Sequence, residues 1–285
     1  MKSGDKVDWN KSNTILIIAF VIINIFLFTT DYNTKADNEL SVYEDKNFIE
    51  NVKMQLNSKN IKIETDVPKE TYTLPVLETE YEIIEINDEL VQNYLGANIK
   101  SSKDVLVYNN NQGETLEIVD GKRIVYTIRQ KISSNVDDFN DEVVNNAINE
   151  FLQNKKISKE GFINTENYIY SDYQIATYAQ KYNELSLENS YMSFYVDKEG
   201  IYKFEMQKIS SVMEIKAKVH TISSYEALLR LMAYDEIKNK NIIGIKMTYY
   251  SLENDNWKYI TRINADPTWK VIFSDGTHIL LSSFD

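Results

Sequence analysis

The sequence predicts an α+β fold in which a single N-terminal transmembrane helix is followed by an extracytoplasmic domain of antiparallel sheets packed with helices. One continuous apolar segment lies near the amino terminus, at residues 14–30, and no second run of that kind follows it. Beyond it, segments with alternating apolar residues, typical of strands, are interspersed with segments whose apolar residues recur every three or four positions, typical of helices.

The composition is that of a folded, acidic chain without thiols. Hydrophobic residues make up 43% of the 285 residues and charged residues 26%, which excludes wholesale disorder. A formal net charge of −12 disfavours binding to nucleic-acid phosphates. Because the chain has no cysteine, disulfides, thiolate metal sites and cysteine nucleophiles are excluded.

The apolar segment predicts a membrane anchor at residues 14–30. Every residue from Ile15 to Phe28 except Asn24 is strongly apolar, and as a helix this run would be roughly 25 Å long, close to the hydrocarbon thickness of a bilayer. Trp9 and Tyr32 flank it as membrane-interface anchors. A cleaved signal peptide and a buried core helix are the alternatives. The first lacks small residues at a cleavage site, and the second lacks a hydrophilic face.

The charges around the anchor predict a cytoplasmic N-terminus at residues 1–13 and a C-terminal domain outside the cell. Three lysines precede the anchor and two follow it within reach of the positive-inside rule. The long acidic remainder is consistent with an exported domain. Asn24, in the outer half of the anchor, either bonds a partner helix or is tolerated through its own helix and interfacial water.

Residues 31–155 are predicted to form a first α+β half. Asn87 and Gly96 are suited to cap the two ends of a short helix, and Asp120-Gly121 between alternating runs predicts a hairpin. The expected elements, in order, are a helix at 38–59, strands at 61–65 and 80–86, a helix after Asn87 to Leu95, a strand at 104–108, hairpin strands at 115–119 and 123–129, and a long helix at 136–152.

Residues 156–285 are predicted to form a second, similar half, because the polar stretch 153–167 with Gly161 has the character of a boundary. Ser223 and Glu226 have the spacing of a capping box that opens a helix. The expected strands are 173–180, 191–196, 201–207, 214–221, 242–250, 257–264, 269–273 and 278–281.

No catalytic residue, cofactor site or metal site is predicted. The two histidines, His220 and His278, have no nucleophile motif to serve and are expected to be structural or solvent-facing. The acidic run 137–142 lacks the glycine and distal glutamate of a calcium loop, and is expected to begin a helix. Glu78, Glu80 and Glu82 are expected on the wet face of a strand, without the aromatic platform that would mark a glycosidase.

Three segments of the chain resemble the YycI (WalI) family of Gram-positive bacteria. The first is Asp8-Trp9-Asn10-Lys11 leading into the anchor, with Asn24-Ile25-Phe26-Leu27 near the anchor's end. The second is the segment from His220 to Leu228, and the third is Pro267-Thr268-Trp269-Lys270-Val271. The resemblance covers the whole chain in layout and is sharp in these places.

The resemblance implies a non-enzymatic regulator. Members of the family are single-pass proteins that pair with a related protein, YycH, and adjust an essential sensor histidine kinase of the WalK/YycG type that controls cell-wall metabolism. The implied mechanism is helix–helix contact in the membrane, which makes Phe20, Asn24 and Phe28 the hypothetical partner contacts. The alternative function is an extracytoplasmic peptide- or wall-fragment-binding module, which a deep aromatic-lined pocket would favour. An exported hydrolase would require carboxylates that converge in a cleft.

Overall fold

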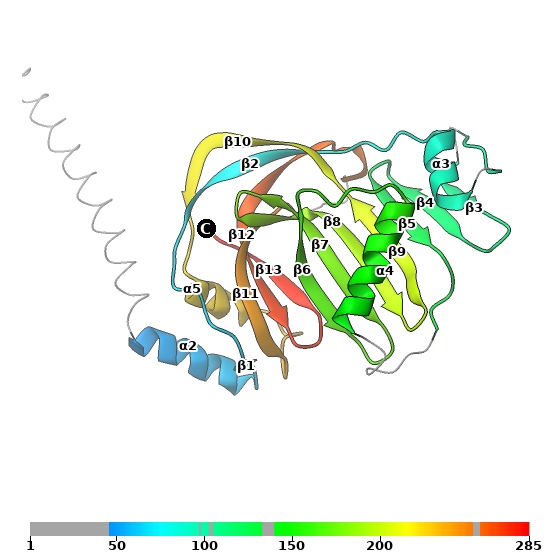
Figure 1. Ribbon diagram of the computed structural model, residues 1–285. Coiled ribbons are helices and arrows are strands. Elements are labelled where there is room, and N and C mark those ends of the chain that lie inside the picture. The colour runs from blue at the N-terminus through cyan, green and yellow to red at the C-terminus, as the bar shows by residue number, and fades with distance from the viewer. Residues whose placement is uncertain (1–45, 97, 103–104, 133–139, 253–256, 285) are drawn as a thin grey trace, which may run out of the picture. The chain divides into compact units, whose positions relative to one another are not determined.

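The computed structural model describes residues 46–96, 98–102, 105–132, 140–252 and 257–284 (Figure 1). The chain divides into two compact units, Met1–Gln55 and Leu56–Asp285. Helix α2 (Lys46–Ser58) is the described part of the first unit and ends within the second. Within the described ranges no helix is both long and apolar enough to cross a bilayer, and the predicted anchor at 14–30 lies outside them.

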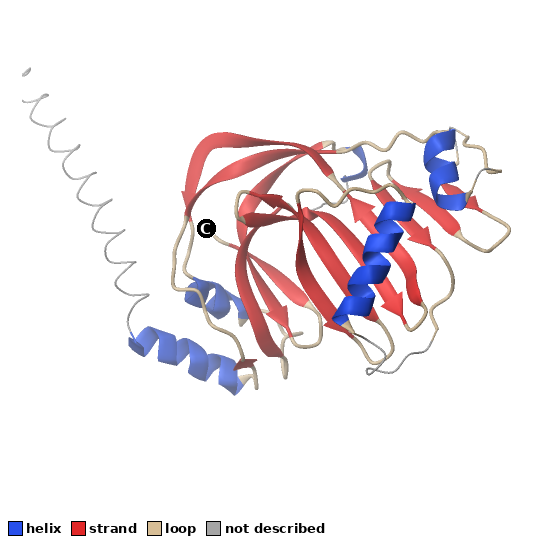
Figure 2. Ribbon diagram, viewed as in Figure 1, coloured by secondary structure: helices blue, strands red, loops and turns tan. Residues whose placement is uncertain are grey.

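The second unit is an α+β structure dominated by one 13-stranded, mostly antiparallel sheet. Figure 2 shows its strands in red and its helices in blue. Its helices are α3 (Asp88–Leu95), α4 (Asp141–Asn154), α5 (Ser224–Leu231) and the short 3-10 helix η2 (Trp257–Tyr259). Its strands are β1 (Lys62–Ile63), β2 (Thr73–Tyr81), β3 (Val107–Asn109), β4 (Thr115–Val119), β5 (Arg123–Thr127), β6 (Phe162–Ile169), β7 (Gln174–Tyr182), β8 (Leu185–Asp197), β9 (Gly200–Gln207), β10 (Ile209–His220), β11 (Asn241–Tyr250), β12 (Arg262–Phe273) and β13 (His278–Ser282).

The sheet consists of two sections that meet at a narrow junction. The first section contains β3 to β9, and the second contains β1, β2 and β10 to β13. Every pairing is antiparallel except those of β11 with β1 and with β8. The β8–β11 contact, which joins the sections, has a single residue pair, Leu187 with Tyr249. Backbone pairing alone therefore holds the two sections together weakly.

Helix α4 covers one face of the first section (Figure 1). Its buried residues follow the helical spacing, and Phe151 packs on Phe194 and Phe204 with ring centroids 6.0 and 5.0 Å away. Asn140 caps the helix by accepting a hydrogen bond from the Glu142 amide at 2.8 Å. The described part of the acidic run thus begins a helix, as predicted, and the expected start at position 136 lies outside the described residues.

The second section is built around Trp269 on β12, which is fully buried. Its indole nitrogen donates to the carbonyl of Ile222 at 3.0 Å, directly before helix α5. A buried indole N–H needs an acceptor, so this bond fixes the approach of α5 to the sheet. Phe273 and Tyr249 complete the core of this section.

The predictions of turns and helix caps from neighbouring residues are confirmed. The hairpin of β4 and β5 forms around Asp120 and Gly121, both at positive φ (51° and 69°), as the Asp-Gly pair predicts. Asn87 caps α3 through the amide of Leu90, and Gly96, at φ 95°, ends it.

The predicted strand at 80–86 is wrong in its position. The strand is β2, which ends at Tyr81, and residues 82–87 continue without regular structure. Pro75 lies inside β2, next to an irregularity in the β2–β10 register between Glu214 and Lys218, where a missing N–H is tolerated.

The predicted break between strands 257–264 and 269–273 is also wrong, because β12 runs through it. Pro267 pairs with Tyr249 of β11 on one side. On its other side β12 passes from β2, whose last pair involves Ala265, to β13, whose first pair involves Thr268. Pro267 occupies the gap between these two partners, where no ladder donor is needed.

The predicted boundary stretch 153–167 contains the beginning of strand β6, which pairs with β7. The strand pairing also crosses the predicted division into 31–155 and 156–285. In particular, β5 pairs with β9, and β2 pairs with β10 and β12. The division into two similar halves, 31–155 and 156–285, stays a prediction.

Replacement of Ser223 by alanine should lower the free energy of unfolding by about 1 kcal/mol, because it removes the N-cap of α5. The Ser223 hydroxyl accepts the Glu226 amide at 3.2 Å. The other half of the predicted capping box is replaced by an ion pair of Glu226 with Arg230 at 3.0 Å. Urea unfolding measures the effect. The exposed Ser274→Ala serves as control, and equal effects of the two substitutions would contradict a capping role.

Candidate functional site

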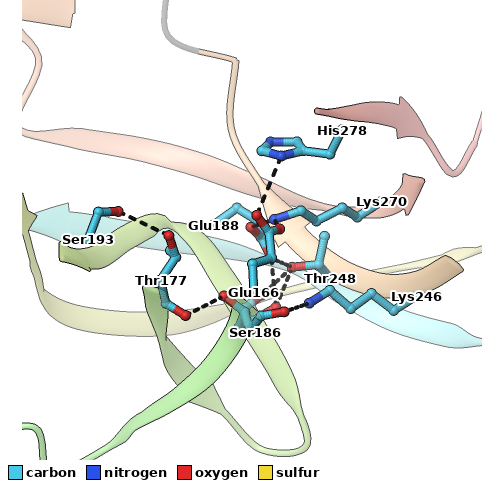
Figure 3. A network of polar contacts seen from close by, with 10 residues as sticks. Glu166, Thr177, Ser186, Glu188, Ser193, Lys246, Thr248, Lys270 and His278 are labelled. Atoms are coloured by element: carbon cyan, nitrogen blue, oxygen red, sulfur yellow. Dashed lines mark hydrogen bonds and ion pairs between the residues drawn. The ribbon is translucent and has the colours of Figure 1, made fainter. Parts of the chain in front are cut away.

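A network of buried charged and polar side chains lies where the two sheet sections meet (Figure 3). We call it the junction network. Its members come from β6, β8, β11, β12 and β13, and are Glu166, Ser186, Glu188, Lys246, Thr248, Lys270 and His278. Both carboxylates belong to the first section, and both lysines belong to the second. The charges are therefore complementary across the junction.

Lys270 is the centre of the junction network. Its side chain is 2% exposed, and its ammonium group forms ion pairs with Glu166 and, at 2.5 Å, with Glu188. The two carboxylates are themselves 8% and 9% exposed. Charges buried to this extent are stable only when they are paired and hydrogen-bonded, so Lys270 and its partners depend on each other.

Hydroxyl groups complete the bonding of Glu188. One of its oxygens accepts hydrogen bonds from Ser186 at 2.8 Å and from Thr248 at 2.9 Å. Burial raises the pKa of Glu188, but the charge of Lys270 and the hydrogen bonds from Lys270 and Ser186 outweigh it, so the pKa lies below its usual range. Glu188 is thus held as a carboxylate.

Lys246 and His278 lie on either side of the central ion pairs. The ammonium group of Lys246 donates to the Thr165 carbonyl at 3.2 Å, which is another contact between the sections. His278 lies with Nδ1 3.7 Å from Glu166. Burial, followed by the positive charge of Lys270, lowers the pKa of both side chains.

The junction network is suited to joining the sections and not to chemistry on a substrate. Its two lysines and two glutamates balance each other, and Lys270 is closed off from solvent. His278 is the member at its rim, with 38% of its side chain exposed. Two hydrogen bonds between Asn189 and the backbone of Ser251, at 2.9 and 2.7 Å, reinforce the same junction.

Acidification should destabilise the protein in two stages through this network. The folded-state pKa of His278 is lowered from 6.5, so below that pH the unfolded chain binds the proton first and stability falls. The pKa of Glu188 is lowered from 4.5, so its contribution is present above that pH and is lost as pH falls through the folded value. Urea midpoints between about pH 8 and pH 2 measure both stages. His278→Phe should abolish the first stage only, and an unchanged first stage would contradict the assignment.

A cavity of about 850 Å³ lies beside helix α3. Its walls are residues 82–85, one side of α3 and the segment 155–157 after α4, with Ile124 and Met206 of the sheet also lining it. The lining is mostly aliphatic and polar, and Tyr94 is its aromatic member. This cavity is thus of ligand-binding size, but it is not the aromatic-lined pocket that the peptide-binding alternative would favour.

Lys155 ties the end of α3 to the end of α4 at this cavity. Its ammonium group donates to the Tyr94 carbonyl at 2.8 Å and to the Tyr126 hydroxyl at 3.2 Å, while Asn93 donates to the Lys155 carbonyl. Burial lowers the pKa of Lys155. A cation at the carbonyl end of a helix is favourable, so this lysine serves the fold.

The sequence-predicted site residues have different outcomes. The predicted interface anchors and partner contacts lie outside the described residues, and these are Trp9, Phe20, Asn24, Phe28 and Tyr32. His220 is exposed at the end of β10, where its Nδ1 lies 3.0 Å from the Thr73 hydroxyl. Within the described ranges no group of three or more histidine and carboxylate side chains is placed to hold a metal ion.

The acidic series at residues 78–82 is only partly as predicted. Glu78 and Glu80 lie on β2 and are partly exposed beside Arg262, with Glu80 at 3.2 Å. Glu82 lies beyond the strand and pairs with Lys208 at 3.0 Å. These are surface ion pairs, which contribute little to stability.

Sequence reasoning missed the junction network. One signal for it exists, since Lys270 stands among apolar residues in Trp269-Lys270-Val271-Ile272-Phe273. A lysine inside a buried strand needs a carboxylate partner, but the partners lie far away in sequence and cannot be identified from spacing.

Comparison with known proteins gives one family. A family model described as YycI protein matches residues 41–279. No curated protein matches the chain.

Several solved structures resemble the chain at low identity. An uncharacterized protein from Eubacterium rectale is 10% identical, with a TM-score of 0.44, and the match covers 82% of this chain and 96% of that one. YycH from Bacillus subtilis is 12% identical, with a TM-score of 0.49, over 75% of this chain and 53% of that one. The YpeB C-terminal domain from Bacillus megaterium is 11% identical, with a TM-score of 0.37, over 69% of this chain and 90% of that one.

Proposed function

Because the chain belongs to the YycI family of two-component accessory regulators, we propose that it is a non-enzymatic, membrane-anchored regulator of an essential cell-wall sensor histidine kinase. The kinase is of the WalK/YycG type, and the protein acts on it together with a YycH-like partner. The observation that carries the proposal is the family match, which includes every strand from β1 to β12 and the start of β13.

The proposed mechanism combines helix contacts in the membrane with contacts of the outer domain. Residues 1–13 lie in the cytoplasm, the anchor at 14–30 meets the helices of the kinase, and the domain beyond it meets the YycH-like partner. Regulation of this kind needs only that the anchor binds one kinase state more tightly than the other.

An interhelical hydrogen bond from Asn24 would be strong enough for such a role. An interhelical hydrogen bond is worth about 1–2 kcal/mol in model peptides, and about 1.4 kcal/mol shifts a two-state equilibrium tenfold. Phe20 and Phe28, one helical turn before and after it, are the proposed packing contacts. Unchanged kinase signalling after Asn24→Leu would remove Asn24 from this role.

A membrane pull-down from native cells tests the proposal. Three tagged forms are compared: the full chain, a chain lacking residues 1–30, and a chain in which 14–30 is replaced by an unrelated single span. The full chain should retain both the kinase and a YycH-like protein. The form with the unrelated span remains in the membrane and should retain the YycH-like protein but lose the kinase.

The outcomes separate the parts of the proposal. If the full chain retains neither protein, the proposed function is wrong. If the unrelated span retains the kinase as well as the native span does, contact through the anchor is wrong and the outer domain carries the interaction.

A further inference from the structure

A strand-like segment beside the cavity has no strand partner on its outer side. Residues Glu82–Ile86 read Glu-Ile-Ile-Glu-Ile, which is typical of a strand, yet they belong to no strand in the structure. Ile84 and Ile86 pack against the core of the first sheet section. Ile83 is 52% exposed. The segment thus has one face fixed to the protein and one face open.

The backbone amides of the segment 82–86 that form hydrogen bonds also lie on one side only. The amide of Glu82 donates to Lys208 at 2.9 Å, and that of Ile84 donates to Gly121 at 2.8 Å. Among the described residues, the amides of Ile83 and Glu85 have no hydrogen-bond acceptor. Successive amides of an extended chain point to opposite sides, so the outer side of this segment is an open edge.

The side chains around this edge combine apolar surface with unpaired acidic groups. Ile83, Leu90 and Ile157 line the cavity, and so do the carboxylates of Glu85 and Glu89. Glu85 and Glu89 are exposed and form no ion pair with the described residues, whereas Glu82 is paired with Lys208. The ammonium group of Lys155 bonds to the end of α3. The other basic residue that lines the cavity with Glu85 and Glu89 is Lys156.

We propose that the cavity binds an extended segment of a partner protein in which basic and apolar residues alternate. The segment adds as a strand along Ile83 and Glu85, its apolar side chains enter the cavity, and its lysine or arginine side chains meet Glu85 and Glu89. Strand addition gives affinity through the main chain, while the carboxylates select the sign of charge. The proposal concerns the outer domain alone and does not depend on the kinase.

The test uses the full chain in detergent micelles and the fluorescently labelled, amidated peptide KVKVKV. Binding is followed by fluorescence anisotropy, beside EVEVEV and beside KVKVKV with N-methyl groups on alternate residues. We expect KVKVKV to bind and EVEVEV to bind at least tenfold more weakly. The form methylated on the pairing side should also lose at least tenfold, because it cannot form strand hydrogen bonds. If the peptide methylated on the pairing side binds as tightly as the peptide methylated on the other side, strand addition is wrong.

Matched variants separate a specific site from general attraction to an acidic protein. Glu85→Lys with Glu89→Lys should abolish KVKVKV binding. Asp235→Lys with Glu236→Lys makes the same charge change at exposed positions outside the cavity, and should retain binding. If both double variants lose KVKVKV binding equally, or if neither variant loses it, the proposal is wrong.

Ile83→Pro removes an amide that makes no hydrogen bond within the described chain, so the fold should survive while strand addition is lost. The thermal midpoint reports on the fold of this variant. Concentration-dependent self-association of the native chain that is abolished by Ile83→Pro would identify a second copy as the occupant, and would overturn the assignment to a partner protein. Loss of peptide binding with an unchanged thermal midpoint would support it.

Discussion

Replacement of Lys270 by methionine should lower the free energy of unfolding by about 3–5 kcal/mol, because it leaves two buried carboxylates without their cation. Methionine fills a similar volume, so the loss reports on charge and not on a cavity. Glu166 and Glu188 are each less than a tenth exposed, and neither can recover its pairing from solvent. Urea denaturation at neutral pH measures the change.

Two further variants make this prediction specific. Lys238 forms an exposed ion pair with Asp235, so Lys238→Met should cost about 0–1 kcal/mol. Adding Glu166→Gln and Glu188→Gln to Lys270→Met should recover part of the loss, since it removes the uncompensated charges. If Lys270→Met costs no more than Lys238→Met, the junction network does not hold the two sheet sections together.

Replacement of Asp197 by asparagine should be the next most damaging change, at about 2–4 kcal/mol. The Asp197 side chain is fully buried and accepts hydrogen bonds from both terminal nitrogens of Arg129 at 2.5 Å. It also accepts the amides of Ile132 and Glu199 at 2.8 and 2.9 Å. The asparagine side chain has nearly the same shape but carries no charge. Its NH2 group would also face N–H groups that need an acceptor.

The measurement is urea unfolding together with hydrogen exchange at the two backbone amides. Exchange at one of these two amides should accelerate in Asp197→Asn, because they bond to different carboxylate oxygens and asparagine keeps only one acceptor oxygen. Asp172→Asn is the control, since the Asp172 pair with Lys131 is about one-third exposed on each side. Unchanged exchange at both Ile132 and Glu199 would show that the Asp197 carboxylate does not hold these two backbone amides.

The sequence was informative where structure depends on neighbouring residues. The Asn87 and Ser223 caps and the Asp120-Gly121 turn are set by bonds within a few positions, and each is found as predicted. The α+β class follows from periodicity alone.

It was uninformative where structure depends on distant partners. A break was predicted between residues 264 and 269, and only the exchange of β2 for β13 beside Pro267 explains why β12 continues. Lys270 meets carboxylates on β6 and β8, a pairing that no local pattern encodes. The segment after Tyr81 has the sequence of a strand, but the partner that would make it one is not among the described residues.

The pairing of β2 with β10 has a consequence for the order in which the protein assembles. Thr73 pairs with His220, 147 positions later, so the second section is made of strands from opposite ends of the unit. Contacts of such sequence separation form slowly, and a chain that emerges amino terminus first cannot form them until it is nearly complete. Strands β3 to β9 are contiguous and can assemble earlier. Until β10 emerges, β2 therefore lacks its strand partner and is exposed to aggregation.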